Sequence, residues 1–156
     1  MPLTRRAALK GLVAAGIGSV TGAGAYGYGY ERHRIGLVYE TLPGSGLPPR
    51  LHGLRLGLVT DLHHSRTVSA DDIQTAVRLM MSAKPDLIVL GGDYVTWGDR
   101  RYVQPCAEIL GGLSAPQGVF AILGNHDDDR DMPAALEAKG FHVLKDARTR
   151  IAINGE

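Results

Sequence analysis

Residues 87–93 read Leu-Ile-Val-Leu-Gly-Gly-Asp, a short apolar run that ends in two glycines and an aspartate. The run follows Lys84-Pro85, which ends a helical pattern, and its length and composition predict a buried strand. The glycines let the backbone turn sharply after the strand and come close to a ligand. The stretch therefore predicts a strand that delivers the carboxylate of Asp93 into a tight turn.

Strands and helices are predicted to alternate on both sides of this stretch. The expected strands cover residues 54–60, 87–90, 119–123 and 141–144. The expected helices cover residues 70–83, 102–110 and 133–139. Ser69 caps the first of them with Asp72 in a capping-box arrangement, and Pro105 is tolerated in the second only within the first turn. This alternation indicates βαβ units, a largely parallel sheet and an α/β fold.

Metal-binding residue types follow three of these strands. Asp61-Leu62-His63 follows the first, Gly92-Asp93 the second, and Gly124-Asn125-His126-Asp127 the third. The carboxyl ends of parallel strands meet at one edge of the sheet, where ligands bind. Each motif alone is common by chance, so the prediction of a site rests on finding all three in this order.

The donor types suit divalent ions. On an extended segment Asp61 and His63 point to the same side and can share one ion, while Asp93 can bridge two. Asn125 offers an amide oxygen, and His126 beside it can point at a phosphate. Mixed carboxylate, imidazole and amide ligands favour Mn, Fe or Zn. His64 points the opposite way and is expected to be a neighbour of the site, not a ligand.

The first thirty residues carry the parts of an export signal. Adjacent arginines at Arg5-Arg6 precede a Gly/Ala-rich apolar run over about 11–25, and Ala23-Gly24-Ala25 offers a cleavage site. The pattern resembles a twin-arginine signal, and an uncut leader could stay as a membrane anchor. The alternative is an ordinary amphipathic helix, which the lack of a polar face disfavours. Residues 31–53 follow as a Pro/Gly-rich linker, with 35–38 as a candidate edge strand.

Composition limits other classes of function. Lysines and arginines number 17 against 16 acidic residues, so no nucleic-acid partner is expected. The positive charge lies mainly in the leader. The lone cysteine, Cys106, excludes an internal disulfide and is expected to be a small core residue.

The three motifs resemble the first three motifs of the calcineurin-like metallophosphoesterases, over residue 54 to the end of the chain. With the leader, the chain is most similar to the exported, YkuE/YaeI-like branch of that family. The resemblance implies a four-layer α/β/β/α sandwich, two divalent metal ions and a phosphate-ester substrate. The residues it implies are Asp61 and His63 for the first metal, Asp93 as bridge, Asn125 for the second, and His126 with Asp127 as catalytic residues. His126 would contact the phosphoryl oxygens or protonate the leaving group, and Asp127 would orient it.

The same resemblance narrows the substrate. The expected substrate is a phosphodiester or pyrophosphate on a lipid-linked or sugar-nucleotide molecule such as UDP-diacylglucosamine. The protein itself is expected to pass through the twin-arginine export machinery and to act at or beyond the bacterial cytoplasmic membrane. Thr96 and Trp97 stand where the protein-phosphatase branch has Asp-Arg, which argues against phosphoprotein substrates. Trp97 and Arg100-Arg101 have two open interpretations, as substrate contacts or as ordinary surface.

The end of the chain predicts a missing part of the domain. Residues 148–153 predict a strand and Asn154-Gly155 a hairpin turn, without a return strand. The family supplies further histidines in a Gly-His-x-His motif, whereas only His142 follows Asp127 here. We therefore expect half a metal site. The alternative function is a truncated, catalytically silent metal-binding fragment.

Overall fold

The computed structural model describes residues 5–30, 33–43 and 46–153, in two compact units that divide between Ile35 and Gly36. The first unit is built on helix α1 (Arg5–Gly29). From residue 12 onward the large apolar side chains of this helix are exposed, among them Leu12, Ile17 and Val20. Within the described parts of the chain, no helix combines the length and the apolar character that crossing a membrane requires.

The second unit holds a four-stranded parallel sheet in the order β1-β2-β3-β4. The strands are β1 (Leu56–Val59), β2 (Leu87–Leu90), β3 (Val119–Ala121) and β4 (His142–Val143). The prediction of an α/β fold with a parallel sheet is confirmed.

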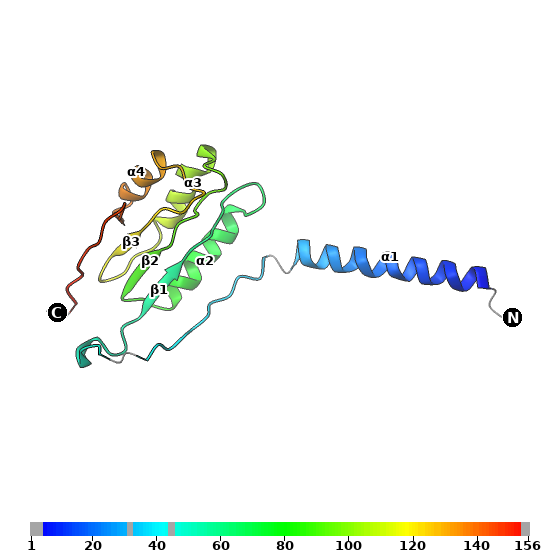
Figure 1. The fold of residues 1–156 in the computed structure, drawn as a ribbon, viewed down its shortest axis with the longest axis horizontal. Coiled ribbons are helices and arrows are strands. Elements are labelled where there is room, and N and C mark those ends of the chain that lie inside the picture. The colour runs from blue at the N-terminus through cyan, green and yellow to red at the C-terminus, as the bar shows by residue number, and fades with distance from the viewer. Residues whose placement is uncertain (1–4, 31–32, 44–45, 154–156) are drawn as a thin grey trace. The chain divides into compact units, whose positions relative to one another are not determined.

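Three helices connect the strands and cover one face of the sheet (Figure 1). They are α2 (Ala70–Ser82), α3 (Arg100–Leu110) and α4 (Asp131–Glu137), and a short 3₁₀ helix, η2 (Pro49–Leu51), precedes β1. Right-handed crossovers between strands that follow one another in spatial order place every connecting helix on the same side. The described residues thus form one helical layer and one sheet, two of the four layers that the family resemblance implies.

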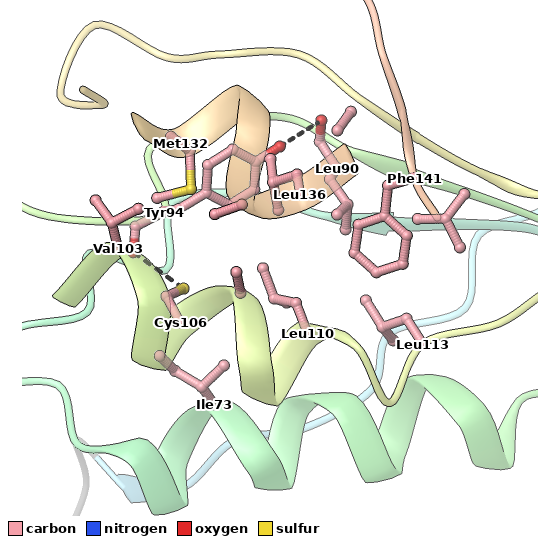
Figure 2. Packing of buried hydrophobic residues seen from close by; sticks show 14 of the residues in the cluster. Ile73, Leu90, Tyr94, Val103, Cys106, Leu110, Leu113, Met132, Leu136 and Phe141 are labelled. Carbon is pink, nitrogen blue, oxygen red and sulfur yellow. Dashed lines mark hydrogen bonds between the residues drawn. The ribbon is translucent and has the colours of Figure 1, made fainter. Parts of the chain in front are cut away.

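The core lies between this helical layer and the sheet (Figure 2). Ile73 of α2, Leu110 of α3 and Leu136 of α4 are almost fully buried. Cys106 is buried among them, as predicted, and its burial raises its pKa to about 12, with the charge of Asp127 as a smaller cause. A thiol in this state is an inert core residue near neutral pH.

Parts of the opposite face of the sheet are apolar and exposed within the described residues. Leu56 and Leu58 of β1 are 57% and 61% exposed, and Ile122 after β3 is 44% exposed. Soluble domains rarely leave contiguous apolar surface of this kind uncovered.

The capping box before α2 forms as predicted. The Ser69 hydroxyl accepts from the Asp72 amide at 3.2 Å, and the Asp72 carboxylate accepts from the Ser69 amide at 3.0 Å. The helix then ends before Lys84, which has a positive φ of 51°.

Three predictions about elements were wrong. Helix α3 begins at Arg100, so Pro105 lies beyond the first turn of the helix and not within it. Proline has no N–H to donate to the carbonyl four residues earlier. Pro105 lies on the exposed face of the helix, where water can bind that carbonyl instead. Residues 148–153 and 35–38 form no strand in the described structure. An apolar run becomes a strand only where a neighbouring strand offers its hydrogen bonds. The predicted turn at Asn154-Gly155 lies outside the described residues.

Candidate metal centre

The segments that follow β1 and β2 stay hydrogen-bonded to each other beyond the strands. The amide of Asp61 donates to the carbonyl of Gly92 at 3.1 Å, and the amide of His63 donates to the carbonyl of Asp93 at 2.9 Å. This pairing places the Asp-x-His motif directly beside the Gly-Asp motif. The sequence prediction that these strand ends meet at one edge is confirmed.

All three acidic and imidazole residues of this edge have left-handed backbone. Asp61, His63 and Asp93 have φ values of 56°, 48° and 55°. The expectation that Asp61 and His63 meet along an extended segment was therefore wrong, since tight turns bring them together. Such conformations cost roughly 1–3 kcal/mol each in non-glycine residues and persist where the surroundings fix them, which is typical of ligand sites.

The three side chains converge on a volume that one ion can fill. One ligand atom from each of Asp61, His63 and Asp93 lies within 4.8 Å of the others. His63 Nε2 is 3.9 Å from Asp61 Oδ1 and 3.7 Å from Asp93 Oδ2. A cation between the two carboxylates would relieve their mutual repulsion. Two carboxylates and an imidazole fit Mn, Fe or Zn, so the residues present suit a first metal.

Asp93 also joins the centre to the loop after β3. Its Oδ1 accepts from the amide of His126 at 2.9 Å, and its side chain is only 14% exposed. A Cβ on Gly124 would overlap Asp93 Oδ1, and one on Gly92 (φ +91°) would overlap the backbone of Gly124. The glycines are needed because the two loops approach each other this closely.

His126 stands next to the cluster. Its ring meets the ring of His63 edge to face, with centroids 4.8 Å apart at 90°. Its Nδ1 lies 3.4 Å from the amide nitrogen of Trp97 and accepts that hydrogen, so the neutral ring carries its proton on Nε2. Asn125, between Gly124 and His126, is exposed to solvent.

Asp127 is bound to backbone amides. Its Oδ2 accepts from Asp93 at 2.8 Å and from Gly124 at 2.9 Å. Its Oδ1 accepts from Tyr94 at 2.7 Å and from Val95 at 3.3 Å. Through the amides of Asp93, Tyr94 and Val95, this carboxylate joins the loop after β3 to the loop after β2.

Two neighbours of the motifs have structural contacts of their own. His64, predicted to be a neighbour of the site, is buried; its Nδ1 donates to the carbonyl of Val68 at 2.9 Å, and its ring packs on Tyr102. Tyr94, which carries no motif signal in the sequence, donates its hydroxyl to the carbonyl of Ile122 at 2.8 Å and so joins the segments that follow β2 and β3. Burial, with the nearby charge of Asp127, raises the pKa of Tyr94 far above its ordinary value.

A known protein family matches the part of the chain that carries these motifs. The family model for the calcineurin-like phosphoesterases matches residues 54–151, the segment that carries all three strand-end motifs. The chain belongs to the calcineurin-like phosphoesterase family. That assignment confirms the resemblance seen in the sequence and makes the chain part of a family of phosphoester hydrolases.

Several relatives of this phosphoesterase share a substantial part of the chain. The metallophosphoesterase YkuE of Bacillus subtilis is 34% identical over 97% of this chain and 56% of its own length. The phosphodiesterase YaeI of Escherichia coli is 41% identical over 60% of this chain and 37% of its own. The UDP-2,3-diacylglucosamine pyrophosphatase LpxG of Chlamydia trachomatis is 36% identical over 49% and 23%. The chain therefore spans about half or less of the length of these relatives.

Proposed function

We propose that this phosphoesterase hydrolyses phosphodiester or pyrophosphate bonds with the help of two divalent metal ions. The observation that carries the proposal is the convergence of Asp61, His63 and Asp93 within 4.8 Å at the carboxyl ends of β1 and β2. When bound, such ions supply an acidified water as the nucleophile of an in-line displacement at phosphorus. No serine or cysteine nucleophile is then required.

Each residue is given a separate role in this proposal. Asp61 and His63 hold the first ion, and Asp93 reaches toward both. Asn125 offers its amide oxygen to the second ion from the loop after β3. Among the described residues this second position has fewer donors than the first, which keeps open the alternative of a metal-binding fragment without turnover.

His126 is proposed to handle the phosphoryl group. Because Nδ1 accepts from the Trp97 amide, Nε2–H is the free donor of the ring. That N–H can bond a phosphoryl oxygen or pass its proton to the leaving group. Asp127 serves as a positioning residue, since its carboxylate holds the amides of both loops.

Metal binding and turnover are tested on the same protein. We expect Mn²⁺ to stabilise the folded chain and so to raise its melting temperature. At a Mn²⁺ concentration 100 times the dissociation constant, the free energy of unfolding should increase by about 2.7 kcal/mol. We expect Asp93→Asn to abolish this shift together with any Mn²⁺-dependent hydrolysis of bis(p-nitrophenyl) phosphate. Asp129→Asn is the matched control, because Asp129 is an exposed acid outside the cluster.

The outcomes separate the two candidate functions. A metal-dependent shift with hydrolysis supports the enzyme, and a shift without hydrolysis supports the silent metal-binding fragment. Equal shifts in the wild type and in Asp93→Asn would contradict both, since the ion would then bind elsewhere.

The substrate class is proposed from the relatives. YaeI is named as a phosphodiesterase and LpxG as a pyrophosphatase of UDP-2,3-diacylglucosamine. A diester or pyrophosphate on a lipid-linked or sugar-nucleotide molecule is therefore the class to test first. A comparison of rates on UDP-diacylglucosamine, on a simple diester and on a phosphopeptide would rank these possibilities.

Export is proposed from the leader alone. The Arg5-Arg6 pair ahead of the Gly/Ala-rich run supports recognition by the twin-arginine machinery and a location at or beyond the cytoplasmic membrane. Residues 1–35 fused to a folded fluorescent reporter should direct it across the membrane. Replacement of both arginines by lysine should stop this, and unaffected export in the lysine variant would contradict the proposal.

A further inference from the structure

An exposed tryptophan stands at the rim of the metal centre. Trp97 is the only tryptophan of the chain, and it is 81% exposed although it is among the most apolar side chains. Its ring lies 4.3 Å from the ring of His126, measured between centroids, at 50°. The His126 ring in turn lies 4.8 Å from that of His63. The rings of His63, His126 and Trp97 therefore form a continuous series of contacts, from a candidate metal ligand to the solvent-exposed indole.

The backbone fixes the position of Trp97. Its φ of 52° is left-handed, which is uncommon for a bulky residue, and the following Gly98 has a φ of 62°. The amide of Gly98 donates to the carbonyl of His126 at 2.7 Å, and the amide of Asp99 donates to the carbonyl of Thr96 at 3.1 Å. A strained backbone held in this way keeps the ring beside His126, while Trp97 takes no part in the hydrophobic core.

The charges near Trp97 are paired within the protein. The guanidinium of Arg100 lies 2.8 Å from the Asp128 carboxylate, and that of Arg101 lies 2.6 Å from the Asp99 carboxylate. Both cations are thus already engaged by carboxylates. The exposed face of the indole is therefore the main surface at this rim that a ligand could contact.

We propose that Trp97 forms a stacking subsite for a planar ring of the substrate, either a nucleobase or an aryl group, attached through the phosphate that binds at the metal centre. This inference rests on the proposed function, because the phosphate must be held beside His63 and His126. Aromatic faces stack on planar rings with little dependence on the identity of the ring. Trp97 would then add affinity for ring-bearing phosphates without touching the reacting bonds.

The single tryptophan makes this subsite directly observable. Four probes are titrated into the Mn²⁺-loaded chain: uridine 5′-monophosphate against ribose 5-phosphate, and phenyl phosphate against ethyl phosphate. Each pair shares the phosphate and differs in the ring. We expect the ring-bearing member to bind about tenfold more tightly, the effect of one stacked base, and to change the emission of Trp97. The two pairs distinguish a nucleobase from an aryl ligand.

Variants at Trp97 test the role of the ring itself. Trp97→Leu should remove the preference for ring-bearing probes in calorimetry, and Trp97→Phe should retain part of it. On an aryl diester, Trp97→Leu should raise KM about tenfold with little change in kcat, since the stack contributes to binding in the ground state and the transition state alike. Mn²⁺ binding, measured separately, should stay unchanged in both variants.

The results overturn the subsite and the proposed function separately. Equal affinity for both members of each pair, or a ring preference that survives in Trp97→Leu, contradicts the subsite and leaves the proposed function standing. Failure of all four probes to bind the metal-loaded chain contradicts the proposed function, and the subsite with it.

Discussion

The carboxylate of Asp127 is bound by backbone amides of two loops beside the candidate metal centre. Its carboxylate accepts from the amides of Asp93 and Gly124 with one oxygen and from those of Tyr94 and Val95 with the other. Hydrogen bonds to charged groups contribute about 1.5–3 kcal/mol each to stability. The bonds to Asp93, Tyr94 and Val95 therefore join the loop after β3 to the loop after β2.

We predict that Asp127→Asn destabilises the protein by about 2 kcal/mol or more. The amide keeps one acceptor oxygen and turns an NH₂ group toward backbone donors, so at least one amide is left unsatisfied. The free energy of unfolding in urea measures the loss. Asp129→Asn replaces an exposed acid two residues away and should leave the stability nearly unchanged. Equal effects of the two variants would show that the four bonds do not form in solution.

At this scale the sequence predicted the types of site residue but not their geometry. Asp61, His63 and Asp93 were identified by type and by position after strands, and the structure brings them together. Their left-handed backbone was not foreseen. Propensity disfavours a positive φ for such residues, and only the pairing between the two loops imposes it.

The contact between Trp97 and His126 could not be predicted from the sequence, for a similar reason. It depends on a tertiary hydrogen bond between segments separated by about thirty residues, for which a single sequence carries no periodic signal.

Among the elements, α3 and α4 are joined by an ion pair whose strength depends on pH. Arg100 at the start of α3 binds the Asp128 carboxylate, which also accepts from the amides of Arg130 and Asp131 just before and at the start of α4. The Asp131 amide first, and the Arg100 guanidinium next, lower the pKa of Asp128 from 3.8 to about 2. A lowered pKa stabilises the fold above pH 3.8, and this stabilisation is lost as the pH falls through about 2.

We predict that Arg100→Gln raises the pKa of Asp128 toward 3.8 without reaching it, because the Asp131 amide still donates. A carboxyl NMR titration of the folded protein measures this pKa. Arg101→Gln is the matched control, since Arg101 pairs with Asp99 and should leave Asp128 unchanged. An Asp128 pKa that does not respond to Arg100→Gln would contradict the bridge between the helices.

Two prolines of the second unit should respond in opposite directions to alanine. Pro105 lies inside α3 on its exposed face and removes one helical hydrogen bond. Pro116 lies in the turn closed by the bond from the Gly118 amide to the Ala115 carbonyl, at a position that suits proline. We expect Pro105→Ala to stabilise the protein by about 1–2 kcal/mol. We expect Pro116→Ala to destabilise it by about 0.5–1 kcal/mol. Urea unfolding checks both, and a loss of stability in Pro105→Ala would show that its ring packs usefully.

Elements with a strong local signal were predicted best. Helix α2 has a capping box and one apolar face, and it forms over nearly the residues expected. The strands over 35–38 and 148–153 had only a short apolar run to support them. Whether such a run forms a strand depends on partners that local sequence does not specify.

The second unit buries the helical face of its sheet and leaves some apolar side chains of the other face exposed. A single order of strands with all crossovers on one side leaves Leu56, Leu58 and Ile122 facing outward. The α/β class could be predicted from the alternation of elements, because right-handed crossovers leave few topologies. The exposure of this face could not, since the apolar residues of β1 are equally suited to packing on either side.

This asymmetry gives a prediction for the whole molecule. Leu58 is 61% exposed, whereas Leu90 on the neighbouring strand is fully buried. We expect Leu58→Thr to change the free energy of unfolding by less than about 1 kcal/mol. Because exposed apolar surface favours association, we expect any self-association of the chain to be weaker in this variant. Leu90→Thr should cost about 3 kcal/mol, because it opens a cavity and buries a hydroxyl.

Urea unfolding and sedimentation measure the two effects on the same samples. If Leu58→Thr destabilises the protein as much as Leu90→Thr does, the outer face is covered in solution and the sheet has two packed sides. If Leu58→Thr leaves the stability intact but shifts the protein toward the monomer, the face is free in each chain and is what draws copies together. The pair of variants thus decides which side of the sheet holds the fold and which side is available for contact.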